Sequence, residues 1–280
     1  CLISFTVPAM FGMLPRFVEK KRLVSAIAVN SSYTQLAVFA GPALAGWIIT
    51  FHGIAMAFAV NALGYAVHLT SLLFLRTPAG YQQPKSRNKS IFGDIVEGLS
   101  YIRGNRRIAA LLVMLLFGDA LGAATFHMAP AYSELILGRG VGGVSTLLAA
   151  IGFGALISAL WLARRGEKSA SIDLVLKAML VATLATGALY LVDTIYLAAA
   201  IGVVIGLAAE TRRTASFAFI QLAVSEAQRG RLMGNMFLLK QLAGGIGTWL
   251  IGSVAASQGL VAPMLIAVGV ALVVWLVFYL

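Results

Sequence analysis

Residues 35–53 read QLAVFAGPALAGWIITFHG, and much of this stretch returns 206 residues later, at 241–259. The residues that match at this single offset are a glutamine, two leucines, an alanine and three glycines. Both copies lie in long apolar runs. The offset is much longer than the roughly 20–50 residues of a solenoid repeat, so it indicates a duplicated half-protein.

The composition is that of a membrane protein. Hydrophobic residues make up 60% and charged residues 11% of the 280-residue chain, and the mean hydropathy is +0.92. A soluble domain carries about 25% charged residues, so this chain has too little polar surface to cover a water-soluble globule. Cys1 is the only cysteine, which excludes an internal disulfide.

Apolar runs of about 20 residues, the length that crosses a bilayer, recur along the sequence. Two lie at 24–50 and 54–75, with a tight turn at His52-Gly53 between them, and residues 1–15 look like the end of another. We expect Gly41-Pro42 to interrupt the first run, because proline lacks a backbone N–H and kinks helices. Six more runs follow at about 108–135, 143–162, 172–192, 194–218, 232–257 and 260–280.

The runs divide the chain into the end of a first lobe (1–75), a linker (76–107) and a second lobe of six spans (108–280). Residues 91–103 of the linker place apolar side chains on one helical face, which predicts an amphipathic helix on the membrane surface. The repeat offset puts the start of the first lobe about 100 residues before Cys1. We therefore expect the first lobe to be incomplete at its N-terminus.

Basic residues mark one side of the membrane. Lysine and arginine concentrate in the loops at 16–23, 76–107, 164–171 and 225–231, whereas only Arg139 falls in a loop of the other side. Because such residues favour cytoplasmic loops, the linker and the C-terminus are predicted to be cytoplasmic. The net charge of +11 is then a signal of topology, and no nucleic-acid partner is expected.

Several segments carry a family resemblance. AVFAGPALAG at 37–46 resembles the fifth-helix antiporter motif of exporters in the major facilitator superfamily, with alanines in place of two of its glycines. ARRGEK at 163–168 resembles the basic cytoplasmic loop motif of that superfamily. RGR at 229–231 and DIVEGLSYIR at 94–103 resemble a loop and the linker helix of its siderophore-exporter and macrolide-efflux branch.

The resemblance implies an all-α, major-facilitator-type bundle of two pseudo-symmetric six-helix lobes that works by alternating access. It also implies a monomeric secondary transporter of the bacterial cytoplasmic membrane, which expels a drug, macrolide or siderophore in exchange for protons. An importer of a small metabolite and a non-transporting membrane scaffold or sensor remain open. An enzyme is disfavoured, because no cluster of polar residues on adjacent spans suggests a catalytic site.

Glycines and loop cations are the first group of candidate residues. The small or kinking residues of the repeat either take part in gating or only allow helices to pack closely. They are Gly41, Pro42, Gly46, Gly247 and Gly252. The residues of the predicted cytoplasmic loops either act as the loop motifs of the family or only anchor the chain to lipid headgroups. They are Arg164, Arg165, Gly166, Lys168, Arg229, Gly230 and Arg231.

Ionisable residues within spans are costly and are candidate functional groups by default. Asp119 lies about 16 Å into its span at 1.5 Å per residue, and it has no basic neighbour on its own helix. Loss of water disfavours its charged form, so it is the first candidate for proton coupling. Glu210 is the second, although a pair with Arg213 would neutralise both, and His127 is a further candidate partner. The alternative is that Asp119 only bonds a neighbouring helix.

Three more polar residues are candidates for the substrate cavity. Lys240 lies inside a span and could either stabilise an ionised Asp119 or meet an anionic substrate, and Gln35 and Gln241 are the paired glutamines of the repeat. No Gly-x4-Gly-Lys-Ser/Thr phosphate loop occurs, the three histidines are isolated, and one cysteine cannot form a thiolate metal site. We therefore expect neither a cofactor nor a metal.

Overall fold

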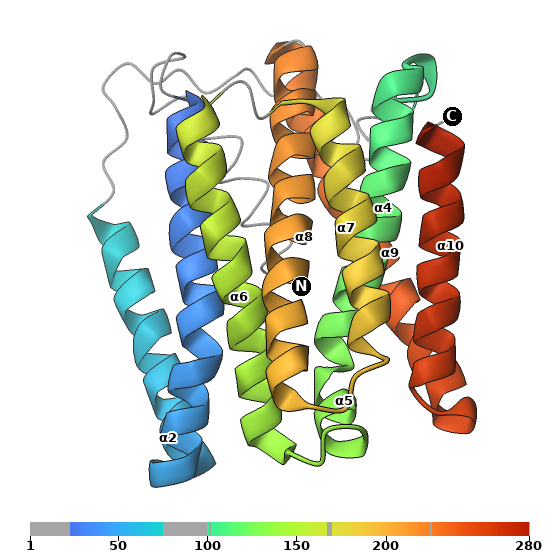
Figure 1. The fold of residues 1–280 in the computed structure, drawn as a ribbon. Helices are drawn as coiled ribbons and strands as arrows, with labels where there is room; N and C mark the ends of the chain where they lie inside the picture. The colour runs from blue at the N-terminus through green and yellow to red at the C-terminus, as the bar shows by residue number, and fades with distance from the viewer. Residues whose placement is uncertain (1–22, 75–99, 101, 167–169, 225, 280) are drawn as a thin grey trace.

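The computed structural model describes residues 23–74, 100, 102–166, 170–224 and 226–279. Throughout these residues every regular element is a helix, and seven helices are long and apolar enough to cross a membrane. They lie side by side with their axes roughly aligned (Figure 1). The prediction of an all-α membrane protein is confirmed.

The first described helix, α2 (Leu23–Leu73), consists of two membrane crossings joined by a sharp reversal. Its apolar part of 40 residues is about 60 Å of helix, twice the thickness of the bilayer core. Gly53 breaks the helical backbone with φ 79° and ψ 168°, a conformation open mainly to glycine, and the two limbs run in opposite directions and diverge from the turn (Figure 1). The predicted turn is therefore confirmed. The interruption expected at Gly41-Pro42 is wrong, since membrane helices tolerate a proline and the helical backbone continues through Pro42.

The six predicted spans of the second lobe are present, and the first of them is divided. The helices are α4 (Arg106–His127), α5 (Ala129–Leu135), α6 (Gly140–Arg165), α7 (Ile172–Leu189), α8 (Ile195–Ala223), α9 (Glu226–Gln258) and α10 (Val261–Tyr279). The predicted continuous span at 108–135 is wrong, because the chain breaks at Met128 and restarts as the short α5. A proline in the first turn of α5 explains the restart, since proline lacks the N–H that would continue α4 and fits a helix start.

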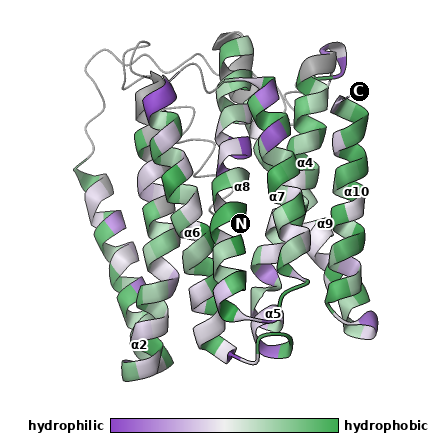
Figure 2. Cartoon of the chain, viewed as in Figure 1, coloured by the Kyte–Doolittle hydropathy of each residue, from purple (hydrophilic) through white to green (hydrophobic). Residues whose placement is uncertain are grey.

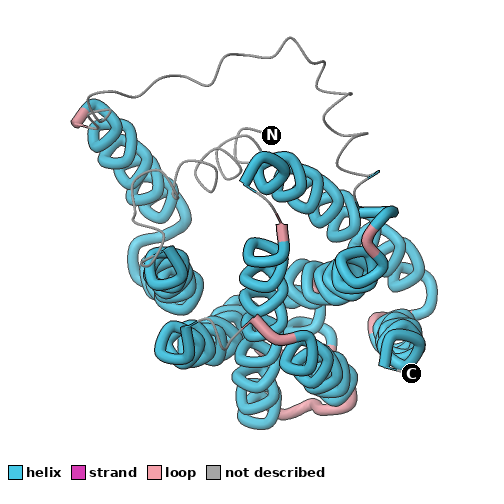
Figure 3. Tube along the Cα trace, turned by 90° about the horizontal axis from the view of Figure 1, so that it is seen from above, coloured by secondary structure: helices cyan, strands magenta, loops and turns pink. Residues whose placement is uncertain are grey.

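Glycines bring α6 and α8 into direct backbone contact. A Cβ at Gly154 of α6 would collide with the Val203 carbonyl oxygen, and one at Gly206 of α8 would collide with the Ile151 carbonyl oxygen. On its other side α6 packs against α2, where a Cβ at Gly46 would lie 3.2 Å from Ser145 Oγ. Helix α6 thus joins α2 to the rest of the bundle (Figure 3).

Tyr132 fixes α5 to the connection between α7 and α8. Its hydroxyl donates towards the carbonyl oxygens of Leu189 and Val192, at 2.8 and 2.9 Å, and its ring packs edge-on against Tyr190. Burial raises the pKa of Tyr132 to about 12, and the charge of Asp193 adds to the shift. The hydroxyl therefore stays protonated and able to donate at any physiological pH.

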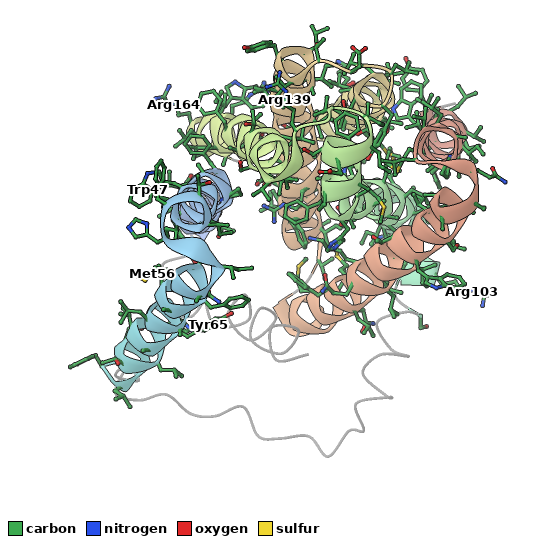
Figure 4. All side chains as sticks on the ribbon, turned by 90° about the horizontal axis from the view of Figure 1, so that it is seen from below. Trp47, Met56, Tyr65, Arg103, Arg139 and Arg164 are labelled. Atoms are coloured by element: carbon green, nitrogen blue, oxygen red, sulfur yellow. The ribbon has the colours of Figure 1, made fainter. Side chains whose placement is uncertain are left out.

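The helices are mostly hydrophobic along their length, and many of the hydrophilic residues lie near the two ends of the bundle (Figure 2). Large apolar side chains such as Trp47 and Met56 point outward from α2 (Figure 4). Arg164 and Arg139 lie at opposite ends of α6, about 38 Å apart along the helix at 1.5 Å per residue. A belt of this height matches a bilayer.

Some predictions fall outside the described residues. These are the end of a span at 1–15, the loop at 16–23 apart from its last residue, Lys168, and most of the linker with its amphipathic helix. Within that helix, Ser100 and residues 102–104 are helical, and the side chain of Ile102 is buried against Ile108 and neighbouring apolar residues.

Candidate functional site

A buried ion pair joins α4 to α8. Arg212 Nη2 of α8 lies 2.7 Å from Asp119 Oδ1 of α4, and the two side chains are only 4% and 8% exposed. Arg212 Nη1 also donates to the carbonyl oxygen of Leu115 at 3.2 Å. Because each charge is withdrawn from water and from lipid, each depends on the other for compensation.

Gly118 provides the space for this pair. A Cβ at Gly118 would lie 2.6 Å from Cζ of Arg212 and 2.7 Å from its Nε. The guanidinium therefore packs closely against Gly118, where a side chain would displace it. The sequence analysis named Asp119 without this neighbour, and the glycine beside it is part of the site.

A second ion pair lies within α8. Arg213 Nη2 and Nε donate to Glu210 Oε2 at 2.6 and 2.9 Å, and Thr214 Oγ1 donates to Glu210 Oε1 at 2.7 Å. The Glu210 side chain is 3% exposed, so both of its oxygens are held away from solvent. The local pairing of Glu210 with Arg213 that the sequence suggested is confirmed.

Arg212 is the residue that sequence reasoning missed. Successive residues of a helix project about 100° apart, so two adjacent arginines cannot both face Glu210. Arg213 turns back to its own helix, and Arg212 crosses to α4. The run Glu-Thr-Arg-Arg in an apolar span contained the signal: one cation had no local acid, and Asp119 had no local base.

Lys240 of α9 completes a group of five charges around α4, α8 and α9. Its charge interacts with those of Asp119, Glu210, Arg212 and Arg213. We call these five residues the charge cluster. Its ammonium lies 5.8 Å from the centre of the Phe237 ring, which in turn lies 6.3 Å from the ring of Phe217 on α8.

The small residues of α9 account for the approach of Lys240. A Cβ at Gly247 would lie 2.9 Å from Cβ of Ala120, and one at Gly244 would lie 3.2 Å from Cβ of Ala123. Helix α9 therefore packs on α4 directly beside Asp119. At Gly252 a Cβ would meet Met128 at 3.5 Å, which is an ordinary contact.

One carboxylate oxygen of the charge cluster is left open. Asp119 Oδ2 is buried and has no hydrogen-bond partner among the described residues. A buried acceptor without a partner is costly, so this oxygen is a natural place for a proton, a water or a substrate donor.

The other candidates lie away from the cluster. His127 is exposed at the end of α4, about 12 Å along the helix from Asp119, with its ring against Phe126. Gln241 is exposed, and nothing is described of the Gln35 side chain. A Cβ at Gly41 would meet no described atom within 4 Å, so within this part of the protein Gly41 makes no close helix contact.

The loop candidates lie at one end of the bundle. Arg164 is exposed in the last turn of α6, Arg165 stacks over the Trp161 ring at 4.5 Å, and Gly166 ends the helix with φ 57°. Residues 229–231 belong to the first turns of α9, and their side chains are outside the description. A cation over an indole at a helix end suits the interface between lipid and water.

Two further features bear on chemistry. Across the described ranges, no group of three or more His, Cys, Asp or Glu side chains could hold a metal ion. A cavity of about 500 Å³ between α4, α9 and α10 is lined by apolar side chains such as Phe117, Ile246 and Ile266. It contains none of the charged groups, so the two sites are separate.

Comparison with known proteins agrees with this architecture. A family model described as transmembrane secretion effector, of the major facilitator superfamily, matches residues 1–280. No curated protein matches the chain. Among solved structures it is similar to a bacterial homolog of the human lysosomal transporter Spinster, in an inward-facing and unoccupied conformation, with a TM-score of 0.59 and 18% identity. That similarity covers 96% of this chain and 72% of the other, and at this identity it shows the fold alone.

Proposed function

The chain belongs to the transmembrane secretion effector family of major facilitator transporters, and from this premise we propose that it exports an amphipathic small molecule in exchange for protons. Drugs, macrolides and siderophores are the candidate substrates, in line with the resemblance of the linker and loop motifs. Family and fold are those of a transporter and not of an enzyme.

The buried ion pair of Asp119 and Arg212 is the observation that best supports coupling of transport to protons. With Asp119 ionised, the pair ties α4 to α8. Protonation of Asp119 removes one charge and leaves Arg212 without its counter-ion, so the tie exists in only one protonation state. A ligand shifts a conformational equilibrium only through a difference in its affinity for the two states, and a proton on Asp119 meets that condition.

The distribution of basic residues supports the orientation of the chain in the membrane. Arg164 and Arg165 lie at the end of the bundle that we assign to the cytoplasm of a bacterium, and Arg139 lies at the other end. For a proton-driven exporter in this orientation, protons reach Asp119 from outside and leave on the cytoplasmic side, while substrate moves the opposite way. The word secretion in the description of the family agrees with export.

The test compares Asp119→Asn with the native protein, full-length, in sealed proteoliposomes. We expect the variant to lose accumulation driven by a proton gradient, while exchange down a substrate gradient survives, because asparagine keeps the shape of the side chain and cannot titrate. Asp173→Asn is the matched control, since that carboxylate pairs with Lys177 on the exposed face of α7. Accumulation against a gradient by Asp119→Asn, with unchanged pH dependence, would show that Asp119 is only structural.

A second variant separates coupling from folding. Loss of one partner of a buried pair costs about 3–5 kcal/mol, so Asp119→Asn by itself strains the bundle. The double variant Asp119→Asn/Arg212→Gln removes both charges, and it should fold as the native protein does and still fail to couple. Uptake instead of efflux in these vesicles would favour an importer, and absence of any transport would favour a scaffold or sensor.

A further inference from the structure

The charge cluster holds three cations and two carboxylates. Arg212 pairs with Asp119, and Arg213 pairs with Glu210. Lys240 makes no salt bridge within the described residues, although it interacts at longer range with all four of the other charges. When all five groups are ionised, the cluster carries one uncompensated positive charge, and it lies inside a membrane span.

Among the residues that the structure describes, no further carboxylate pairs with Lys240. Its ammonium lies 5.8 Å from the centre of the Phe237 ring, and such a contact attracts the cation without neutralising its charge. The Lys240 side chain is only partly exposed, and the Phe237 ring beside it lies 6.3 Å from the ring of Phe217. An amphipathic anion would stabilise a cation in such surroundings strongly. Its negative group would pair with the ammonium, and its apolar part would pack against the aromatic side chain.

We propose that Lys240 binds the anionic group, such as a carboxylate or sulfonate, of the exported compound, while Phe237 and Phe217 contact its apolar part. This inference rests on the proposed export function and narrows its substrate class to amphipathic anions. Cationic amphipaths are disfavoured, because they would add to the excess positive charge.

Depth argues for a substrate over a lipid headgroup. Lys240 lies eight residues beyond the start of the apolar segment of α9 at Leu232, or about 12 Å at 1.5 Å per residue. Headgroups lie outside the hydrocarbon core, so an anion that meets Lys240 at this depth must enter the bundle.

The experiment measures binding to the purified full-length protein in nanodiscs of phosphatidylcholine, with no proton gradient. The probes are three fluorescent dansyl amides of equal size that end in a carboxylate, a neutral amide or a trimethylammonium group. We expect the carboxylate probe to bind most tightly to the native protein. Lys240→Gln should weaken that binding by about tenfold or more and leave the neutral probe unchanged, and Lys240→Arg should keep the preference.

Lys177→Gln is the matched control, because Lys177 is an exposed lysine of α7 outside the charge cluster. The proposal is overturned if folded native protein fails to bind the carboxylate probe, or binds the other probes equally well. It is also overturned if Lys240→Gln keeps the preference for the anion. Loss of probe binding when phosphatidylglycerol is added would assign Lys240 to lipid. Because no gradient is used, these outcomes are independent of whether Asp119 couples transport to protons.

Discussion

The absence of a side chain at Gly118 allows the charge of Arg212 to be buried. The guanidinium of Arg212 occupies the space in which a Cβ would stand, and it is held there by Asp119 and by the Leu115 carbonyl. A guanidinium with two fixed hydrogen bonds cannot move aside as a free side chain does. The identity of residue 118 therefore controls the geometry of the pair.

We expect Gly118→Ala to destabilise the protein by about 1–3 kcal/mol, the usual cost of overpacking. The expected readout is a lower thermal denaturation midpoint in detergent and weaker proton coupling in proteoliposomes. Gly122→Ala is the matched control, because Gly122 lies one turn further along the same helix and a Cβ there meets nothing within 4 Å. Equal midpoints for the two variants would show that Arg212 can move aside without cost.

The ion pairs of the site were predicted only where the partner was local. Glu210 and Arg213 are three residues apart, so the spacing alone brings them together. Asp119 was chosen for its depth, but its pairing with Arg212 depends on the packing of two helices distant in sequence, which no spacing reveals. The contacts of Lys240 depend on the approach of α9 to α4 in the same way.

At the scale of elements, the Gly202-x3-Gly206 pair of α8 offers an internal comparison. A Cβ at Gly206 would collide with a backbone oxygen of α6, whereas the three atoms nearest to one at Gly202 are side-chain atoms of Leu147, Ala150 and Ile151, at 3.3 to 3.4 Å. The backbone near Gly206 cannot move without separating the two helices. The longer side chains near Gly202 can adjust their rotamers.

Gly206→Ala should therefore lower stability by about 1–3 kcal/mol or more, and Gly202→Ala by clearly less. Thermal denaturation of both variants in the same detergent measures the difference. A larger loss for Gly202→Ala would mean that the close approach of α6 and α8 does not hold the bundle together.

Most helices followed from the sequence, because long apolar runs bounded by charged or glycine-containing turns leave few alternatives in a membrane. The break at Met128 did not, since Pro130 stands within an apolar run that looks continuous. The opposite error occurred at Pro42, where a proline that suggested an interruption lies in unbroken helix. A proline alone does not say whether its neighbours compensate for the missing hydrogen bond.

At the scale of the whole molecule, the contact between α2 and α6 joins the segment before the linker to the segment after it. Gly46 faces Ser145 there, and the rings of Phe39 and Phe153 lie 5.5 Å apart further along the same pair of helices. Alternating access requires the two lobes to move against each other. This contact is therefore expected to slide or open during each transport cycle.

A reversible cross-link tests this movement. In a Cys1→Ser background without other cysteines, Gly46→Cys/Ser145→Cys should form a disulfide on oxidation, because the Cβ positions are about as close as that bond requires. Transport should then stop and return on reduction. Gly41→Cys/Ser145→Cys is the control and should not cross-link. Full transport by the cross-linked protein would mean that α2 and α6 move as one body.

The reversal at Gly53 also decides how this part of the chain enters the bilayer during synthesis. The first limb ends at His52 and the second begins at Ile54, with no polar loop between them. Neither limb can therefore be inserted alone with a loop translocated across the membrane. A turn stalled within lipid would leave backbone groups without hydrogen bonds, which a bilayer does not tolerate. The two limbs must therefore cross together, and the insertion machinery receives them as a single hairpin.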